Sequence, residues 1–237
     1  FKINLIYFLN MEINLIVAYC NKNGIGRMNN IPWLIKDDLK HFKIITITNT
    51  NKLPNSYEYQ KNVVVMGRNT WESLPAKVRP LANRFNIVLS SKSKFIDSDK
   101  VDFTTTSFEN VLSYLEFEKE KFNNFKIFII GGEVLYTDIL KNYSDLITHL
   151  YITEIYANYT CDKFFPTINN NIFKISKVSE FNNENNINYR YLVYSHINKV
   201  NDFYVNKEEK QYSDLIHNII YNGLERNDRT NVGTLSL

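Results

Sequence analysis

The sequence predicts an α/β fold, in which helices pack against a central sheet of buried strands. Three continuous apolar runs rich in valine and isoleucine, at residues 12–19, 62–67 and 126–130, are typical of strands buried on both faces. Each run leads through glycine toward a stretch with the spacing or start signals of a helix. This alternation of buried strands and helices is the pattern of an α/β domain.

The composition limits the class of protein. With 237 residues, 44% of them hydrophobic, the chain can form one large domain or one domain and a fragment. A net charge of +3, from 28 basic and 25 acidic residues, gives no bulk electrostatic argument for binding nucleic acid or a membrane. No apolar run reaches the ~18 residues of a membrane span. Cys20 and Cys161 lack metal-ligand spacing, which predicts reduced thiols in a cytoplasmic protein and no metal site.

Changes in composition divide the chain into four expected segments. Residues 1–10 are an apolar upstream or tag-like segment, because Met11 is a plausible start. Residues 11–200 form the main domain, and residues 201–210 are a charged and polar linker. Residues 211–237 begin with an amphipathic helix pattern that ends at an Asn-Gly pair.

Residues 24–42 combine a glycine-hinged loop, a Pro-Trp pair and an amphipathic helix that begins near Lys36. Apolar positions at roughly helical spacing predict that one face of this helix packs inward; they are Leu39, Phe42, Ile45 and Ile47. Asp38 stands beside that face. Taken alone, Asp37 and Asp38 are more often a solvated pair that interacts favourably with the helix N-terminus.

Two junctions between a strand and a helix predict anion sites. At Gly67 a buried strand runs into Arg68 and a helix start, so free backbone N–H groups lie beside a guanidinium that suits phosphate. Gly131 and Gly132 follow the strand at 126–130 and permit a pyrophosphate to approach the next helix N-terminus. The spacing is not GxGxxG, so a Rossmann fingerprint is excluded. Each pattern alone is a weak signal.

Five motifs together resemble those of dihydrofolate reductases. They are Gly-Ile-Gly with Pro-Trp and Asp-Leu-Lys-His-Phe (24–42), Met-Gly-Arg-Asn-Thr-Trp-Glu-Ser (66–73), Arg-Pro-Leu-Ala-Asn-Arg-Phe-Asn-Ile-Val-Leu-Ser (79–90), Ile-Ile-Gly-Gly-Glu-Val-Leu-Tyr (129–136) and Asp-Lys-Phe-Phe-Pro (162–166). The resemblance covers roughly residues 12–197. It implies a mostly parallel sheet of about eight strands with an antiparallel final strand and helices on both faces. It also implies NADPH-dependent reduction of 7,8-dihydrofolate to 5,6,7,8-tetrahydrofolate.

The resemblance assigns the substrate site. It makes Asp38 the catalytic acid that binds the pterin and supports protonation of N5, and Thr153 the residue that hydrogen-bonds this carboxylate. Arg84 holds the α-carboxylate of the substrate's glutamate tail, for which the bidentate geometry of arginine is suited. The remaining substrate residues by resemblance are Ile16, Val17, Ala18, Leu39, Phe42, Ser73, Leu74, Leu81 and Ile130. An apolar wall of Ile16, Leu39 and Phe42 is expected to raise the pKa of Asp38.

The resemblance also assigns a cofactor site for NADPH. Its expected residues are Ala18, Ile25, Gly26, Gly67, Arg68, Asn69, Thr70, Ser90, Ser91, Lys92, Gly131, Gly132, Glu133, Val134, Leu135 and Tyr136. Ile25 and Gly26 belong to the loop that closes over the nicotinamide, and Arg68 is the main candidate for preferring NADPH over NADH. Family members commonly have an arginine where Ser91 stands, so Lys92 is the candidate to compensate.

The last segment, from about residue 211 to 236, resembles the opening of thymidylate synthases. In Asp-Arg-Thr-Asn, Arg229 matches the arginine that binds the nucleotide phosphate, and Asn231 replaces the usual glycine. The order of the two parts is that of bifunctional protozoan enzymes of thymidylate and one-carbon metabolism. Because the segment stops before any synthase nucleophile, we expect it to be inactive. The full-length form is expected to be a homodimer through its synthase domain.

Two other functions stay open at this point. One is a reductase of the same fold that acts on another heterocycle, such as a pyrimidine of riboflavin synthesis; Asp38 together with Arg84 argues against it. The other is an inactive scaffold that positions the synthase domain or binds RNA. We expect dihydrofolate and antifolates as ligands and no requirement for nucleic acid or a membrane, and tight binding of a 2,4-diaminopyrimidine antifolate would separate an enzyme from a scaffold.

Overall fold

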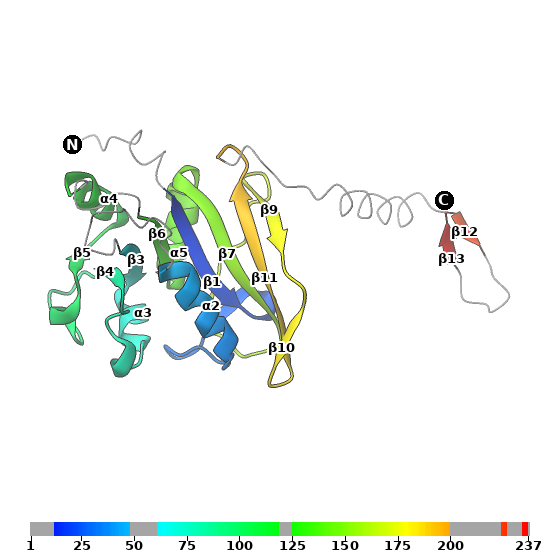
Figure 1. Ribbon diagram of the computed structural model, residues 1–237, viewed down its shortest axis with the longest axis horizontal. Coiled ribbons are helices and arrows are strands. Elements are labelled where there is room, and N and C mark those ends of the chain that lie inside the picture. The colour runs from blue at the N-terminus through cyan, green and yellow to red at the C-terminus, as the bar shows by residue number, and fades with distance from the viewer. Residues whose placement is uncertain (1–11, 48–60, 119–124, 200–223, 227–233, 237) are drawn as a thin grey trace, which may run out of the picture. The chain divides into compact units, whose positions relative to one another are not determined.

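The computed structural model describes residues 12–47, 61–118, 125–199, 224–226 and 234–236 (Figure 1). Several expectations fall outside these residues. They are the segment 1–10, the linker 201–210, the helix 211–223 and the phosphate-binding candidate Arg229.

A nine-stranded mixed sheet forms the centre of the first unit, Phe1–Val200. Its strands lie in the order β10 (Asn182–Glu184), β11 (Ile187–His196), β7 (Ile147–Tyr156), β1 (Ile13–Tyr19), β6 (Ile127–Gly131), β3 (Asn62–Gly67), β4 (Arg84–Leu89) and β5 (Phe103–Thr105), and β9 (Phe173–Val178) also pairs with β11. The strands from β7 to β5 are parallel, whereas β11 runs antiparallel to β7. The predicted mostly parallel sheet with an antiparallel final strand is confirmed.

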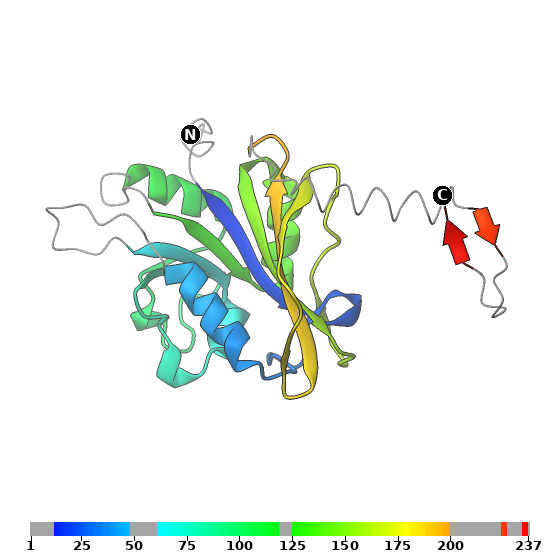
Figure 2. The same cartoon turned by 45° about the vertical axis from the view of Figure 1, so that its right-hand side comes forward.

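Side chains of the central strands alternate between two helical layers, as the pleat of a strand requires. Val63 and Val65 of β3 face the core that includes α4 (Phe108–Phe117) and α5 (Glu133–Asn142). The intervening Val64 and Met66 pack with α2 (Lys36–Ile47) and α3 (Arg68–Ser73) on the other face. Figure 2 shows α2 in front of the sheet and α5 behind it. Helices therefore cover both faces, as predicted.

The parallel strands β1, β3, β4 and β6 all end at one edge of the sheet, which is where open α/β sheets bind their ligands. Beyond the end of β1, β2 (Gly24–Gly26) pairs with β8 (Lys163–Phe164). Short 3-10 helices complete the fold; they are η1 (Asn21–Asn23), η2 (Ala76–Val78), η3 (Ser98–Lys100) and η4 (Ser144–Leu146). None of the described helices is long and apolar enough to cross a membrane.

One helix boundary differs from the sequence prediction. The pattern Thr106-Ser-Phe-Glu109 predicts a capping box and a helix that runs to about Lys121. In the structure α4 begins at Phe108 and ends at Phe117. Its N-cap is Ser107, whose Oγ accepts a hydrogen bond from the backbone N–H of Asn110 at 3.2 Å. The prediction was wrong by one residue because Ser and Thr are both strong N-caps and stand side by side here.

In the second unit, Asn201–Leu237, the described residues form two short strands. β12 (Leu224–Arg226) and β13 (Thr234–Ser236) pair antiparallel, with Leu224 opposite Ser236. The two strands flank in sequence the motif that resembles a thymidylate synthase opening.

Candidate active site

Asp38 lies in the first turn of α2, where the helix packs against the sheet. Its Oδ1 accepts a hydrogen bond from Thr153 Oγ1 at 2.6 Å. Thr153 is buried on β7, where it pairs with Ala18 of β1 on one side and Tyr191 of β11 on the other. The structure therefore brings together two residues that are far apart in the sequence and that the resemblance places together.

Burial sets the acidity of Asp38. It raises the pKa of the Asp38 carboxyl above its ordinary value, and the hydrogen bond from Thr153 lowers it by a smaller amount. The nearby phenols of Tyr189 and Tyr191 have raised pKa values as well, chiefly because of burial and in part because of the Asp38 charge. A carboxyl group in such surroundings holds its proton more tightly than a solvated one, which suits a group that supports proton transfer.

The inward stripe of α2 differs from the predicted one. Leu39 is 52% exposed, so it is not part of a buried wall around Asp38, and that expectation was wrong. The stripe consists of Asp38, Phe42, Ile45 and the fully buried Thr46. Asp38, Phe42 and Thr46 follow one another at intervals of four residues, and Ile45 is three residues after Phe42. These intervals are close to the helical period, so Asp38 is itself on the inward face and Leu39 stands at its flank.

Arg84 is held at the other end of α2. Its guanidinium is buried, and Nη1 donates to Thr46 Oγ1 at 2.9 Å while Nε donates to the carbonyl of Ala82 at 3.1 Å. The guanidinium also lies over the ring of Phe42, 5.8 Å from its centroid. Within the described residues, no carboxylate forms an ion pair with Arg84. Burial lowers the pKa of Arg84 to about 10, so it stays charged at neutral pH.

Gly67 and the pair Gly131-Gly132 form a backbone cradle at the ends of β3 and β6. A Cβ atom built on Gly67 would meet the carbonyl of Gly131 at 3.9 Å, and one on Gly132 would lie 3.2 Å from Thr70 Oγ1. Gly131 has a φ of +121°, a backbone conformation that side chains disfavour. Gly131 therefore requires glycine for its backbone conformation and a Cβ on Gly132 would crowd Thr70, whereas a Cβ on Gly67 would make only an ordinary contact. The first amides of α5, which follow directly, have no side-chain cap among the described residues.

Tyr136 connects this cradle to β1. Its hydroxyl donates to the carbonyl of Ile16 at 2.7 Å, and its ring lies 3.3 Å from the position that a Cβ on Gly131 would take. Complete burial raises the pKa of Tyr136, which keeps the phenol neutral and able to donate. The preceding residue, Leu135, is also buried in the core, whereas Val134 is 81% exposed.

The expected phosphate contacts gather at the neighbouring strand ends, because Gly67 of β3 pairs with Leu89 of β4. Arg68 Nη1 forms an ion pair with Glu72 at 2.7 Å, so its guanidinium is partly engaged within α3. Ser90 is buried, and its Oγ accepts from the backbone N–H of Lys92 at 3.0 Å. The side chains of Asn69, Ser91 and Lys92 are exposed.

The other expected substrate residues divide between the two faces of the sheet. On the α2 face, one cluster contains Ile16, Phe42, Leu74, Leu81 and Ile130. Val17 points into the opposite core beside α4 and α5, because neighbouring residues of a strand face opposite ways. The side chain of Val17 therefore lies on the face of the sheet opposite to that of Ile16. Ser73 is exposed, and its hydroxyl donates to the carbonyl of Thr70 at 2.7 Å.

The loop after β1 is fastened to the segment before β8. The backbone N–H of Asp162 donates to the carbonyl of Gly26 at 3.0 Å, and the N–H of Met28 donates to Asp162 Oδ2 at 3.0 Å. Ile25 is partly buried against the core. The sequence identifies Asp162 only as part of the motif Asp-Lys-Phe-Phe-Pro. Its two hydrogen bonds to this loop are a feature that the motif alone does not predict.

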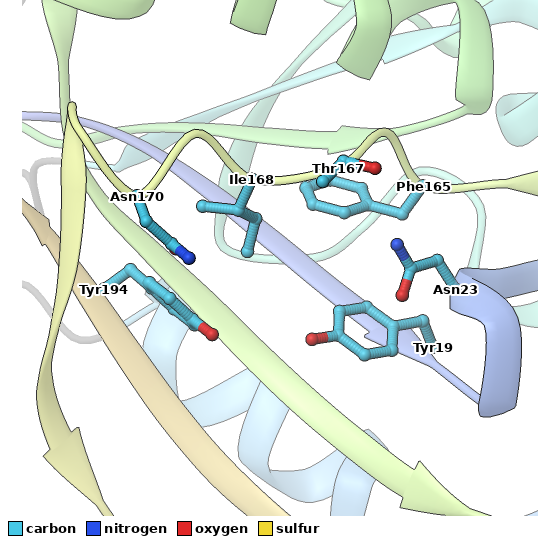
Figure 3. Close-up of a pocket in the computed structure, with 7 residues that line it drawn as sticks. All are labelled: Tyr19, Asn23, Phe165, Thr167, Ile168, Asn170 and Tyr194. Carbon is cyan, nitrogen blue, oxygen red and sulfur yellow. The ribbon is translucent and has the colours of Figure 1, made fainter.

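A pocket of about 190 Å³ lies elsewhere and is a different feature (Figure 3). It is lined by Tyr19, Asn23, Phe165, Thr167, Ile168, Asn170 and Tyr194. Tyr19 and Phe165 belong to the core on the α5 side, whereas Asp38 lies on the α2 side. Its lining holds no carboxyl or imidazole group, so this pocket is separate from the Asp38 carboxyl. Among the described residues, no cluster of His, Cys, Asp and Glu could hold a metal ion.

Comparison with known proteins identifies the family of the chain. Residues 12–196 match the family model described as dihydrofolate reductase. Three bifunctional dihydrofolate reductase-thymidylate synthases are similar to this chain. The protein from Zea mays is 31% identical over 94% of the chain, that from Paramecium tetraurelia 32% over 96%, and that from Plasmodium chabaudi 32% over 78%. The chain spans 47%, 44% and 36% of these relatives, less than half of each.

The match to the family model includes Asp38, Thr153, Arg84 and the glycine cradle, and it reaches from the start of β1 to the end of β11. By this match and by its identity to these relatives, the chain belongs to the dihydrofolate reductase family.

Proposed function

We propose that the domain built on the nine-stranded sheet catalyses NADPH-dependent reduction of 7,8-dihydrofolate to 5,6,7,8-tetrahydrofolate. The observation that carries this proposal is the Asp38 carboxyl, which has a raised pKa and is held at 2.6 Å by Thr153 on the face that also presents Arg84. Membership of the dihydrofolate reductase family supports the reaction class.

Asp38 performs two tasks in this proposal. Its carboxylate accepts hydrogen bonds from the 2-amino and N3–H groups of the pterin. The second carboxylate oxygen stays available for these bonds, because only Oδ1 accepts from Thr153. It also supports protonation of N5, which makes the neighbouring carbon a better hydride acceptor. Because the pKa of Asp38 is raised, its carboxyl stays protonated closer to neutral pH than a solvated carboxyl does. General acid assistance increases a reaction rate by about 10² to 10⁴.

Arg84 binds the α-carboxylate of the glutamate tail. Its buried guanidinium has hydrogen bonds to a hydroxyl and a carbonyl, yet no anionic partner within the described residues. A buried cation without a counter-ion is unfavourable, so a carboxylate ligand that supplies the missing charge is bound strongly. The contact with Thr46 fixes Arg84 to the same helix that carries Asp38.

The glycine cradle fits a nicotinamide cofactor. Gly131 and Gly132 leave room where side chains would contact Tyr136 and Thr70, and the free amides of α5 suit a pyrophosphate. When bound, NADPH supplies the hydride. In this proposal Arg68, which follows β3, and Lys92, which lies beyond the end of the neighbouring β4, bind its 2′-phosphate side. Lys92→Met should lower the kcat/KM ratio of NADPH over NADH, and an unaltered ratio would remove Lys92 from this role; Lys94→Met is the surface control.

The deciding experiment is an assay of NADPH oxidation by the purified chain with 7,8-dihydrofolate as substrate. We expect activity that a 2,4-diaminopyrimidine inhibits, and a loss of at least 10² in turnover for Asp38→Asn at pH 7. Activity with a pyrimidine of riboflavin synthesis instead of dihydrofolate would reject the proposed substrate. Absence of activity with every substrate, together with failure to bind the diaminopyrimidine, would favour a scaffold.

The longer protein is a separate proposal. The relatives carry the name of a bifunctional enzyme, and the chain covers less than half of their length. We propose that the natural protein continues into a thymidylate synthase domain, with Arg229 as its nucleotide-phosphate ligand, that it dimerises through this domain, and that it acts in the cytoplasm without nucleic acid or a membrane. Size measurement of the full-length protein tests the dimer.

A further inference from the structure

A carboxylate from the far edge of the sheet caps the helix that carries Asp38. The first described backbone amides of α2, those of Lys36 and Asp37, donate to the two carboxylate oxygens of Glu184 at 3.0 Å each. Glu184 is the last residue of β10, opposite Ile187 of β11. The contact joins residues separated by almost 150 positions, so no local capping signal in the sequence predicts it.

The hairpin that presents Glu184 is well suited to hold it in place. Between β10 and β11, Asn185 and Asn186 have φ values of 54° and 62°, the left-handed pair of a tight hairpin turn. Asn185 Nδ2 also donates to the carbonyl of Leu34 at 3.5 Å, which adds a weaker contact to the segment just before the helix. β11 pairs with β7, the strand that carries Thr153.

We propose that Glu184 is a positioning residue for Asp38, which it serves by fixing the first turn of α2 and by offsetting the positive end of that helix. The proposal rests on the role of Asp38 in the proposed function. Asp38 follows Asp37 directly, so the helix turn that carries it is fastened to the sheet twice. One attachment is from Thr153 to its side chain, and the other is from Glu184 to the adjacent backbone.

The charge of Glu184 gives this contact an effect that a neutral cap would lack. The free N–H groups of a helix N-terminus favour the ionised form of a nearby carboxyl and so lower its pKa. An anion bound to these same N–H groups offsets that field, so Asp38 retains its proton to higher pH. Among the described residues, the other ionisable groups near Asp38 are Asp37 and His41 on its own helix and the phenols of Tyr189 and Tyr191 on β11. Burial lowers the pKa of His41, whose ring stacks on that of Tyr191 with 3.9 Å between centroids, and Lys40 is paired with Asp37 at 2.7 Å.

Two substitutions separate the cap from its charge. Glu184→Gln keeps an oxygen that accepts from the helix amides but removes the charge, whereas Glu184→Ala removes both. Glu180→Gln is the matched control, because Glu180 is exposed and its side chain forms no hydrogen bond or ion pair with any described residue. The titration of Asp38 is followed by carboxyl-carbon NMR, the first turn of α2 by amide hydrogen exchange, and turnover as a function of pH.

For Glu184→Gln we expect proton binding by Asp38 to weaken about two- to fivefold, which moves the pH profile of turnover toward acid while amide exchange in α2 stays near wild type. For Glu184→Ala we expect faster exchange at Lys36 and Asp37 and lower turnover at every pH. The Gln variant should restore the exchange rate. The control should match wild type in all three measurements.

Two results would overturn the proposal. One is a wild-type Asp38 titration in Glu184→Gln. The other is a Glu184→Ala variant that loses only thermal stability, since a purely structural cap would change the stability and leave the pH profile in place. If the wild-type chain does not oxidise NADPH with dihydrofolate, the proposed function fails, and the NMR titration with amide exchange still decides whether Glu184 positions Asp38.

Discussion

Replacing Thr153 with valine is the sharpest test of how Asp38 is tuned. Valine keeps the branched shape of threonine and removes the hydroxyl that donates to Asp38 Oδ1 at 2.6 Å. Because this hydrogen bond stabilises the ionised carboxyl, it lowers the pKa of Asp38 against the larger, opposite effect of burial. Its loss should therefore raise that pKa further.

The size of the effect follows from the kind of bond that is lost. A hydrogen bond to a charged group contributes about 1.5 to 3 kcal/mol, which corresponds to roughly ten- to hundredfold tighter proton binding by Asp38. The pH above which turnover falls should rise accordingly in Thr153→Val. Maximal turnover should decrease, because the carboxyl loses one of the contacts that orient it.

The measurements are the pH profile of turnover and the NMR titration of the Asp38 carboxyl. Thr148→Val, earlier on the same strand β7, is the control for removing a threonine hydroxyl from this strand. A Thr153→Val profile that coincides with wild type, or that moves toward acid, would show that the hydroxyl does not stabilise the Asp38 anion and would refute the reasoning.

Three further substitutions test other parts of the site. Asp38→Asn should stabilise the fold at pH 7, because an acid whose folded pKa is raised costs stability once it ionises; urea unfolding should show the gain disappearing as the pH falls to the ordinary value of 3.8. Arg84→Ala should raise the KM for dihydrofolate about ten- to hundredfold with little change in kcat, and steady-state kinetics with an unaltered KM would reject its contact with the glutamate tail. Gly131→Ala should lower the free energy of unfolding by about 1 to 3 kcal/mol, because a φ of +121° suits only glycine. In the same denaturant titration, the control Gly26→Ala should change that free energy much less, because the φ of Gly26 is not in this range.

Much of the fold was predictable because its signals are local. The continuous apolar run at 62–67 is the property of a strand covered on both faces, and β3 is indeed buried between two helical layers. The paired glycines at 131 and 132 were predictable as a point of close packing, and a Cβ there would crowd the side chains of Tyr136 and Thr70. The antiparallel final strand was expected from the family resemblance alone, because periodicity does not specify which strands are neighbours or how they run.

The errors have equally local causes. Leu39 fits an apolar spacing, yet the inward stripe of α2 passes through Asp38 and Thr46, which are polar. A hydropathy pattern could not identify that stripe because two of its members, Asp38 and Thr46, are polar. Val17 was expected among the substrate residues with Ile16 and Ala18, and alternation along the strand directs its side chain to the other face. Glu184 gave no signal at all, since its partners are distant in the sequence.

In the proposed function, helix α2 allows one acid and one arginine to act on the same substrate. Asp38 in its first turn is fixed by Thr153, and Thr46 in its last turn is fixed to Arg84. At about 1.5 Å per residue, these two positions are separated by about 12 Å along the helix axis. A ligand with a ring at one end and a carboxylate at the other can therefore contact both groups, whereas a ring without the tail can contact only Asp38. Because the proposed acid chemistry acts on the ring, a truncated substrate that lacks the carboxylate should lose binding more than turnover.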